Sequence, residues 1–117
     1  MESSKAVKPW REAVKWAVLL SVSGDEDFDM IHGPVMASMV FTVRKPTSAP
    51  KKRKTYPSTK PDLSKLIRST EDALTDAGVW EDDARVIGYV RAAKVFPGED
   101  PMALDTPGCV IEVWSVD

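Results

Sequence analysis

Hydrophobic residues recur with helical spacing in two segments of the chain. The first set follows Pro9: Trp10, Ala13, Val14, Ala17 and Val18. The second set follows Asp62: Leu63, Leu66, Ile67, Thr70, Leu74 and Ala77. Intervals of three and four residues place such side chains on one face of a helix. Pro9 suits a first helical position, Asp62 an N-cap and Gly78 the position just past a C-terminus, so we predict two amphipathic helices.

Three further segments have the alternating pattern of β-strands: residues 35–44, 85–96 and 109–116. The stretch 46–61 holds four prolines and five cationic residues without periodicity, so we predict an exposed, extended and mobile loop, called here the basic loop. The order helix, strand, helix, strand, strand predicts one α+β domain over residues 1–117, with a small mixed sheet. A core of this size is modest, and we expect a partner subunit to cover the sheet.

Composition excludes several classes of protein. Hydrophobic residues make up 43% and charged residues 29%, as in ordinary globular chains. A single cysteine excludes an internal disulfide, and a single histidine argues against a histidine-rich metal site. No segment has the length and apolarity of a membrane span or a secretory signal, so we expect a cytoplasmic protein without a membrane partner.

Charge is strongly segregated along the chain. From Arg44 to Arg68 there are nine basic residues and one acid, a net charge of +8, which leaves −10 for the rest. The acids gather at residues 25–29 and 71–83. A basic loop beside an acidic cluster is typical of a metal-dependent enzyme that acts on a polyanion. It is also the composition of an ordinary lysine-rich loop, so charge alone leaves both interpretations open.

The second helix carries a polar row opposite its apolar face. Ser64, Arg68 and Glu71 are spaced i, i+4, i+7, with Asp62 at the head of the row. Mg²⁺ is usually held by one or two carboxylates together with waters and phosphate oxygens.

The turn that contains Asp82 and Asp83 is expected to fold back beside Asp62 and so complete a magnesium site. Such an ion activates water at a phosphodiester, and Arg68 or a loop lysine steadies the developing charge. The alternative is that Asp62 is a simple helix cap and the other acids are solvated surface charge.

Three linked motifs follow one another along the second half of the chain. They are Lys60-Pro61-Asp62-Leu63-Ser64-Lys65-Leu66, then Asp72-Ala73-Leu74, then Ala77-Gly78-Val79-Trp80-Glu81-Asp82-Asp83. Together they resemble the RusA family of Holliday-junction resolvases from bacteria and phages. Lys94 fits the lysine that ends the following strand in the family. The similarity covers nearly the whole chain. It implies a homodimeric endodeoxyribonuclease of phage origin that acts in DNA recombination and repair. Such an enzyme uses Mg²⁺, or Mn²⁺ in its place, to make paired nicks in four-way junctions.

The resemblance assigns the metal to Asp62 and Asp83, with Asp82 in support. A third metal-binding acid of the family falls on Ser64, whose hydroxyl supplies no charge, and an essential lysine falls on Arg68. Glu71 lies about 10 Å further along the helix, so we expect it to act in the second shell or through water. The departure at Ser64 leaves an alternative: a non-catalytic protein that binds branched DNA on the same fold. A structural or interaction domain is a third interpretation.

Six cationic side chains are expected to follow the DNA backbone: Lys51, Lys52, Arg53, Lys54, Lys60 and Lys65. Family members also place a strand and a basic loop before the first helix, where only a few residues precede Pro9 here. Either this chain is part of a longer protein, or its sheet has one strand fewer and an exposed edge. The four tryptophans are expected to belong to the core rather than to stack on DNA.

Overall fold

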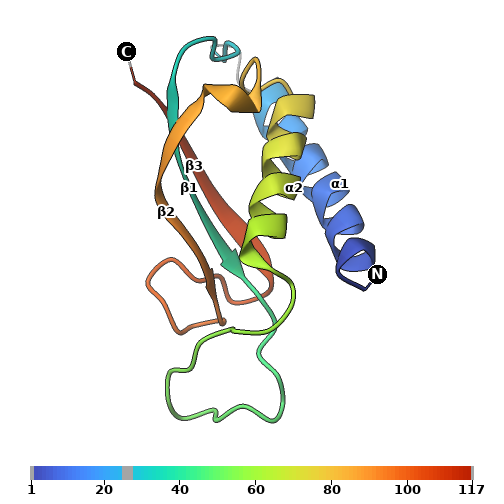
Figure 1. Cartoon of the computed structure of the whole chain (residues 1–117), viewed down its shortest axis with the longest axis vertical. Helices are drawn as coiled ribbons and strands as arrows, with labels where there is room; N and C mark the ends of the chain where they lie inside the picture. The colour runs from blue at the N-terminus through green and yellow to red at the C-terminus, as the bar shows by residue number, and fades with distance from the viewer. Residues whose placement is uncertain (1, 25–27, 117) are drawn as a thin grey trace.

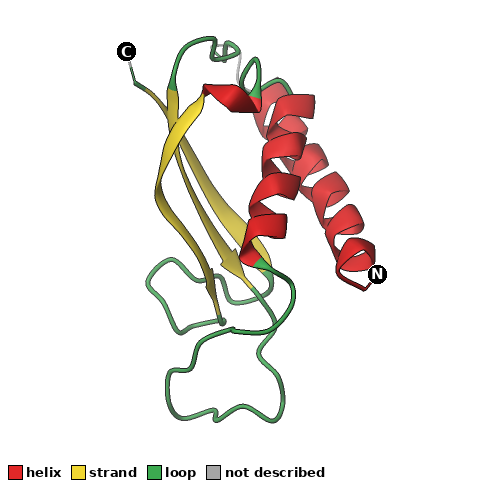
Figure 2. Cartoon of the chain, viewed as in Figure 1, coloured by secondary structure: helices red, strands yellow, loops and turns green. Residues whose placement is uncertain are grey.

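Two helices cover one face of a three-stranded sheet (Figures 1 and 2). The computed structural model describes residues 2–24 and 28–116. Its elements are α1 (Glu2–Ser23), β1 (Val35–Thr42), α2 (Leu63–Asp76), the short 3-10 helix η1 (Asp83–Arg85), β2 (Val86–Val95) and β3 (Gly108–Ser115). The basic loop extends beyond the end of the sheet, next to the loop that joins β2 to β3 (Figure 1). The α+β prediction is confirmed.

The strand order β2-β1-β3 makes β1 the central strand. β1 pairs parallel with β2 and antiparallel with β3, which gives the mixed sheet. Between the two helices and β1 lies a core of seven buried residues: Val35, Met39, Phe41, Leu66, Leu74, Val79 and Trp80. Trp80 is fully buried and its Nε1 donates to Thr75 Oγ1 at 2.7 Å, so the chain after α2 is fixed to that helix.

The second helix matches its prediction closely. α2 begins directly after Asp62, and Gly78 follows its C-terminus with φ of 80°, a left-handed conformation that glycine adopts without strain. Its buried side also includes Ser69 and Ala73, which were not in the predicted stripe.

The first helix differs from its prediction. It begins at Glu2, so Pro9 lies inside it, where the missing N–H costs one hydrogen bond without ending the helix. Val14 is buried, and the ring of Trp10 lies tilted against that of Phe41 with centroids 5.9 Å apart, but Ala13 and Ala17 are exposed. Within the described residues, no helix is long and apolar enough to cross a membrane.

The tryptophans are divided between the core and the surface. Trp80 is buried, whereas Trp16 is 61% exposed on α1 and Trp114 is 42% exposed on β3. The expectation that all four belong to the core is therefore wrong. α1 carries apolar side chains on two faces, and only one of these faces packs against α2, so Trp16 on the other face remains exposed.

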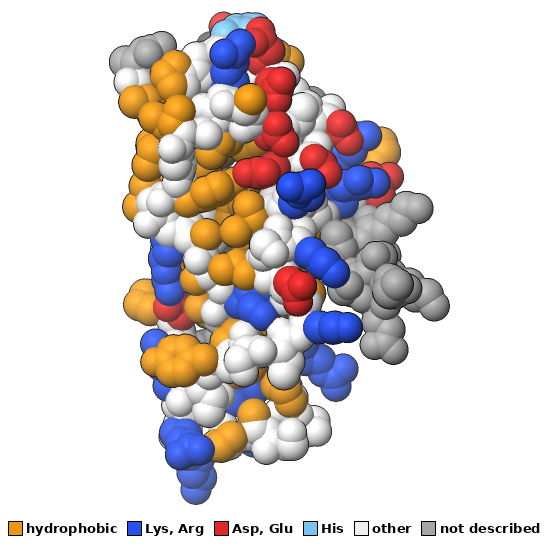
Figure 3. Space-filling view, viewed as in Figure 1, with side chains coloured by type: hydrophobic (Ala, Val, Ile, Leu, Met, Phe, Trp, Pro, Cys, Tyr) orange, Lys and Arg blue, Asp and Glu red, His pale blue; other side chains and the backbone are white. Residues whose placement is uncertain are grey.

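Two bulges interrupt the pairing of β2 with β1. The register passes over Ile87 and Val90, which are 62% and 66% exposed on this edge strand. A bulge residue lies outside the ladder, so strict alternation fails here. Along the left side of Figure 3, apolar side chains remain at the surface of the sheet.

Replacing a core leucine should destabilise the domain far more than replacing an exposed aliphatic residue. Leu74 is 2% exposed, so Leu74→Ala removes buried methyl groups and should lower the free energy of unfolding by about 3 kcal/mol. The matched control Leu20→Ala, at a residue 73% exposed on α1, should change it by less than about 0.5 kcal/mol. Urea unfolding of the three proteins measures both values; equal losses would contradict this core.

Candidate functional site

Asp62 occupies the N-cap position of α2 but its carboxylate does not cap the helix. The side chain makes no capping hydrogen bond, and it is 52% exposed with Lys65 Nζ at 4.0 Å. The backbone carbonyl of Asp62 instead accepts from the N–H groups of Lys65 and Leu66 at 3.1 Å. The carboxylate is therefore not consumed by helix capping, and it lies where the basic loop ends.

The acidic turn, residues 81–83, is held in place from two sides. Backbone hydrogen bonds join Ile31 N to Val79 O and Glu81 N to Ile31 O, each at 3.0 Å, so this segment lies against residue 31. Asp82 Oδ1 then accepts from the N–H of Ala84 at 3.0 Å and caps η1. The turn leaves both Asp82 and Asp83 exposed.

Asp82 and Asp83 act as a pair of unequal acids. The hydrogen bond from Ala84 N–H, followed by that from Asp83, lowers the pKa of Asp82. The hydrogen bond to Asp82, partial burial and the charges of Asp82 and Asp72 raise the pKa of Asp83, against the opposing charge of Arg68. Two neighbouring carboxylates offer several oxygen donors to a hard divalent cation.

The structure does not bring the acidic turn next to Asp62. In Figure 1 the segment that forms η1 lies beside the C-terminal end of α2, whereas Asp62 directly precedes the N-terminal end of that helix. A helix of 14 residues is about 21 Å long, so the two acidic positions are well separated. Among the described residues, no three acids, histidines or cysteines are grouped closely enough to hold an ion. The packing of Trp80 under α2 keeps the turn beside the C-terminal half of the helix.

One residue of the polar row on α2 forms a hydrogen bond with a side chain of β2. Glu71 accepts a hydrogen bond from the hydroxyl of Tyr89, which lies beside it on β2. Burial first, and then this bond to Glu71, raises the pKa of Tyr89, and the charge of Asp83 adds to the shift. Ser64 and Arg68 are exposed. Glu71 is thus fixed near Asp83 rather than near Asp62.

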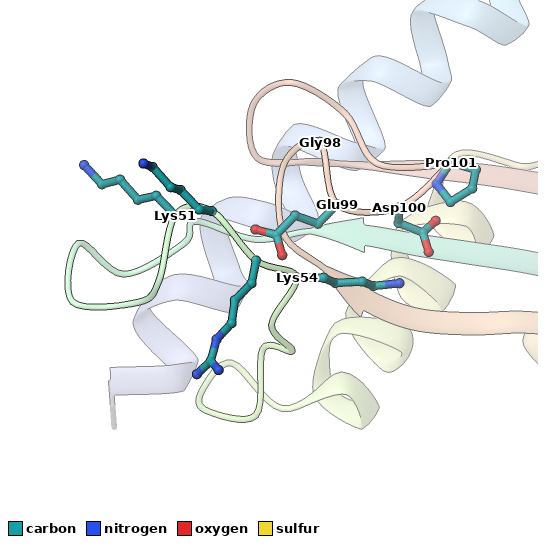
Figure 4. A pocket seen from close by; sticks show the side chains of 8 residues that line it. Lys51, Lys54, Gly98, Glu99, Asp100 and Pro101 are labelled. Carbon is teal, nitrogen blue, oxygen red and sulfur yellow. The ribbon is translucent and has the colours of Figure 1, made fainter.

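A cationic groove opens between the basic loop and the loop after β2. It is an open, shallow depression of about 540 Å³, lined by Lys51, Lys52, Arg53, Lys54, Gly98, Glu99, Asp100 and Pro101. Figure 4 shows Lys51 extending away from the two acids, while Lys54 runs beside Asp100. In Figure 3 acidic side chains concentrate toward the acidic turn and cationic ones toward the basic loop. The groove fits a polyanion.

The two acids of the groove are already paired within the protein. Asp100 is 7% exposed and receives two hydrogen bonds from the guanidinium of Arg91, at 2.7 and 2.8 Å, with a third from Met102 N–H. Glu99 pairs with Lys45 and accepts from Thr55 N–H at 2.8 Å. Their charges are therefore largely neutralised by their own partners, and the lysines of the groove remain in excess.

A family model described as endodeoxyribonuclease RusA matches residues 1–113. The chain belongs to the RusA family. This family comprises endodeoxyribonucleases that act on branched DNA, as the sequence motifs predicted. No curated protein matches the chain at a significant level.

Some residues of this RusA-family site have no signal in the sequence. Nothing in the sequence distinguishes Tyr89 from the other residues of its strand. The pairing register places it opposite Ala37, on the face of the sheet that the helices cover. Glu99 and Asp100 lie in a loop rich in proline and glycine, where an acid usually faces water. Lys94, in contrast, was identified in the sequence by its place in the family pattern.

The Arg91–Asp100 pair predicts a loss of stability in acid. Its hydrogen bonds, those of Arg91 first, hold the pKa of Asp100 well below the ordinary 3.8. The stabilisation is complete above 3.8 and is lost as pH falls through the lower pKa of the folded protein. We expect the urea midpoint of the wild type to fall more steeply than that of Asp100→Asn between about pH 4 and about pH 2. Parallel curves for the two proteins would contradict this assignment.

Proposed function

We propose that this chain is a divalent-metal-dependent endodeoxyribonuclease that resolves four-way DNA junctions by paired phosphodiester cleavage. The observation that carries the proposal is the carboxylate of Asp62. It lies directly after the basic loop, half exposed and free of a capping bond. An exposed acid that does not cap its helix, at the end of a cationic loop, suits metal binding better than capping. The family to which the chain belongs supports the same reaction.

The metal-binding residues of the proposal are Asp62 and Asp83, with Asp82 in support. In kind they fit Mg²⁺ or Mn²⁺, since both ions prefer oxygen and Mg²⁺ takes one or two carboxylates with waters and phosphate. In this proposal they form two half-sites, Asp82–Asp83 and Asp62, since among the described residues no three potential ligands lie close enough together to hold an ion. When bound, such an ion polarises a phosphoryl oxygen and acidifies a water. The variants below test each half-site separately.

Arg68 and the loop lysines bind and orient the DNA in this proposal. Arg68 lies on α2 between the two half-sites, and its guanidinium is suited to the negative charge of a phosphodiester. Lys60 and Lys65 flank Asp62 in sequence, and residues 51–54 line the groove. Phosphate contacts of this kind supply affinity without reading sequence.

The homodimer is also part of the proposal. Paired cleavage of two strands requires two sites, which a two-fold dimer provides. Exposed apolar side chains on the edge strands support an interface there: Ile87, Val90, Trp114 and the adjoining Val116.

A second candidate is favoured by Ser64 and by the separation of the acids. A protein with the groove but without a complete metal site binds branched DNA and does not cut it. The cations of the groove are suited to the phosphates of the DNA backbone, and the loss of a carboxylate on α2 does not affect them.

Cleavage of an end-labelled four-way junction, with the matching duplex as control, distinguishes the two candidates. In Mg²⁺ or Mn²⁺ we expect symmetric nicks in the junction alone. Asp62→Asn and Asp83→Asn should each lower the rate at least about a hundredfold, because each removes a carboxylate of the site. Asp105→Asn, an exposed acid in the loop after β2, is the matched control and should cut normally.

Each possible result supports or excludes one of the two candidate functions. A normal rate in either site variant removes that half-site from the mechanism, and normal rates in both contradict the proposal. Junction binding in Ca²⁺ without cutting in Mg²⁺ or Mn²⁺ establishes the non-catalytic candidate. Ser64→Asp then shows whether the missing carboxylate is the cause.

Removing the charges of the groove should flatten the salt dependence of junction binding. Changing residues 51–54 to glutamine eliminates four cations, so the slope of log K against log salt should decrease by about 3 to 4 units. Arg85→Gln, at the acidic turn and paired with Glu81, is the control and should leave the slope unchanged. Binding measured by fluorescence anisotropy across a salt series gives the slope; an unaltered slope in the fourfold variant rejects the groove as the DNA-binding surface.

A further inference from the structure

Side chains from outside the basic loop bind its backbone at its centre. Glu99 accepts a hydrogen bond from Thr55 N–H at 2.8 Å and pairs with Lys45, which follows β1. The ammonium of Lys45 also donates to the carbonyl of Arg53 at 3.4 Å. The backbone on both sides of Lys54 is thereby tied to the sheet and to the loop after β2.

A second attachment holds the end of the basic loop. Lys94 Nζ donates to the carbonyl of Thr59 at 2.7 Å and to that of Pro61 at 2.9 Å. Pro61 directly precedes Asp62, so Lys94 binds the peptide group next to the candidate catalytic carboxylate. Two of the three ammonium protons are used in these bonds.

The first attachment is stronger than an ordinary surface ion pair. The side chains of Lys45 and Glu99 are only 16% and 17% exposed, and the ammonium lies 5.7 Å from the ring centroid of Phe96. The hydrogen bonds from Lys45 and from Thr55 N–H lower the pKa of Glu99, so its carboxylate stays charged at neutral pH. Charge-assisted hydrogen bonds that are shielded from water are roughly twice as strong as neutral ones.

The attachments hold backbone groups, which leaves the cationic side chains of residues 51–54 available to the groove. An extended segment whose backbone is attached at residues 53, 55, 59 and 61 has less conformational freedom than the mobile loop that the sequence predicts. Ordering a loop in advance removes an entropic cost from binding.

We propose that Glu99 and Lys94 are positioning residues that hold the basic loop in its DNA-binding conformation and set its distance from Asp62. The DNA-binding part of this inference rests on the proposed function. The two possible roles of Glu99 predict opposite changes in DNA affinity when its charge is removed. If it were only an acid beside a DNA groove, removing its charge would strengthen DNA binding. If it positions the loop, removing it weakens binding although the groove becomes more positive.

The experiment combines limited trypsin digestion with junction binding in Ca²⁺. Trypsin cuts after the cationic residues 51–54, so the rate of cutting there reports how often the loop opens. We expect Glu99→Ala and Lys94→Met to raise this rate about tenfold, and Glu99→Ala to weaken junction binding about threefold. Asp105→Ala removes the same charge from the same loop without an attachment shown in the described structure. It should leave the trypsin rate unchanged and should not weaken binding.

Glu99→Gln covers the case in which Glu99→Ala fails to fold. Its amide oxygen still accepts from Thr55 N–H but loses the ion pair with Lys45, so an intermediate trypsin rate is expected. Wild-type trypsin rates in the Glu99 and Lys94 variants overturn the inference. So does a faster trypsin rate in Glu99→Ala accompanied by tighter junction binding. If the wild type binds no junction DNA, the proposed function fails, and the trypsin rates alone decide whether the attachments hold the loop.

Discussion

The parallel pairing of β1 with β2 determines what lies at the basic end of the molecule. Phe41 pairs with Lys94 and Thr42 with Val95, and Val43 N–H continues the ladder to Val95 O at 2.9 Å. Parallel strands end at the same edge of a sheet. Lys45, just past β1, and Lys94, near the end of β2, therefore reach the same loop from two strands. An antiparallel arrangement would place Lys94 at the opposite end of the sheet, away from the basic loop.

The sequence predicts those parts of the fold that depend on local physics. α2 follows from its apolar spacing together with a cap position and a glycine, and the structure reproduces it almost residue for residue. The start of α1 is not predictable in this way, since proline tolerates a position inside a helix at a cost set by its surroundings. Strand order and the bulges at Ile87 and Val90 depend on contacts between distant segments, which periodicity does not encode.

The sequence predicts which residues belong to the candidate site, but it does not predict how they are arranged in space. The motifs identify Asp62, Asp82 and Asp83 as acids of interest, yet the distance between them is set by the burial of Trp80 against α2. Likewise a lysine in a strand gives no indication that it will bind two loop carbonyls, because that depends on where the loop returns. The family motif identifies Lys94 as a residue of interest, but its contacts with two loop carbonyls are visible only in the structure.

The separation of charge along the molecule sets an order of events for the proposed reaction. The basic loop attracts DNA over a range of about 10 Å, whereas the acidic turn repels it. DNA therefore binds first at the groove, without needing a metal. A phosphodiester can approach Asp82 and Asp83 only when a cation offsets their charge. Replacing a family acid by Ser64 weakens this second step and leaves the first unchanged, so loss of cutting with retention of binding is the change that this architecture permits most easily.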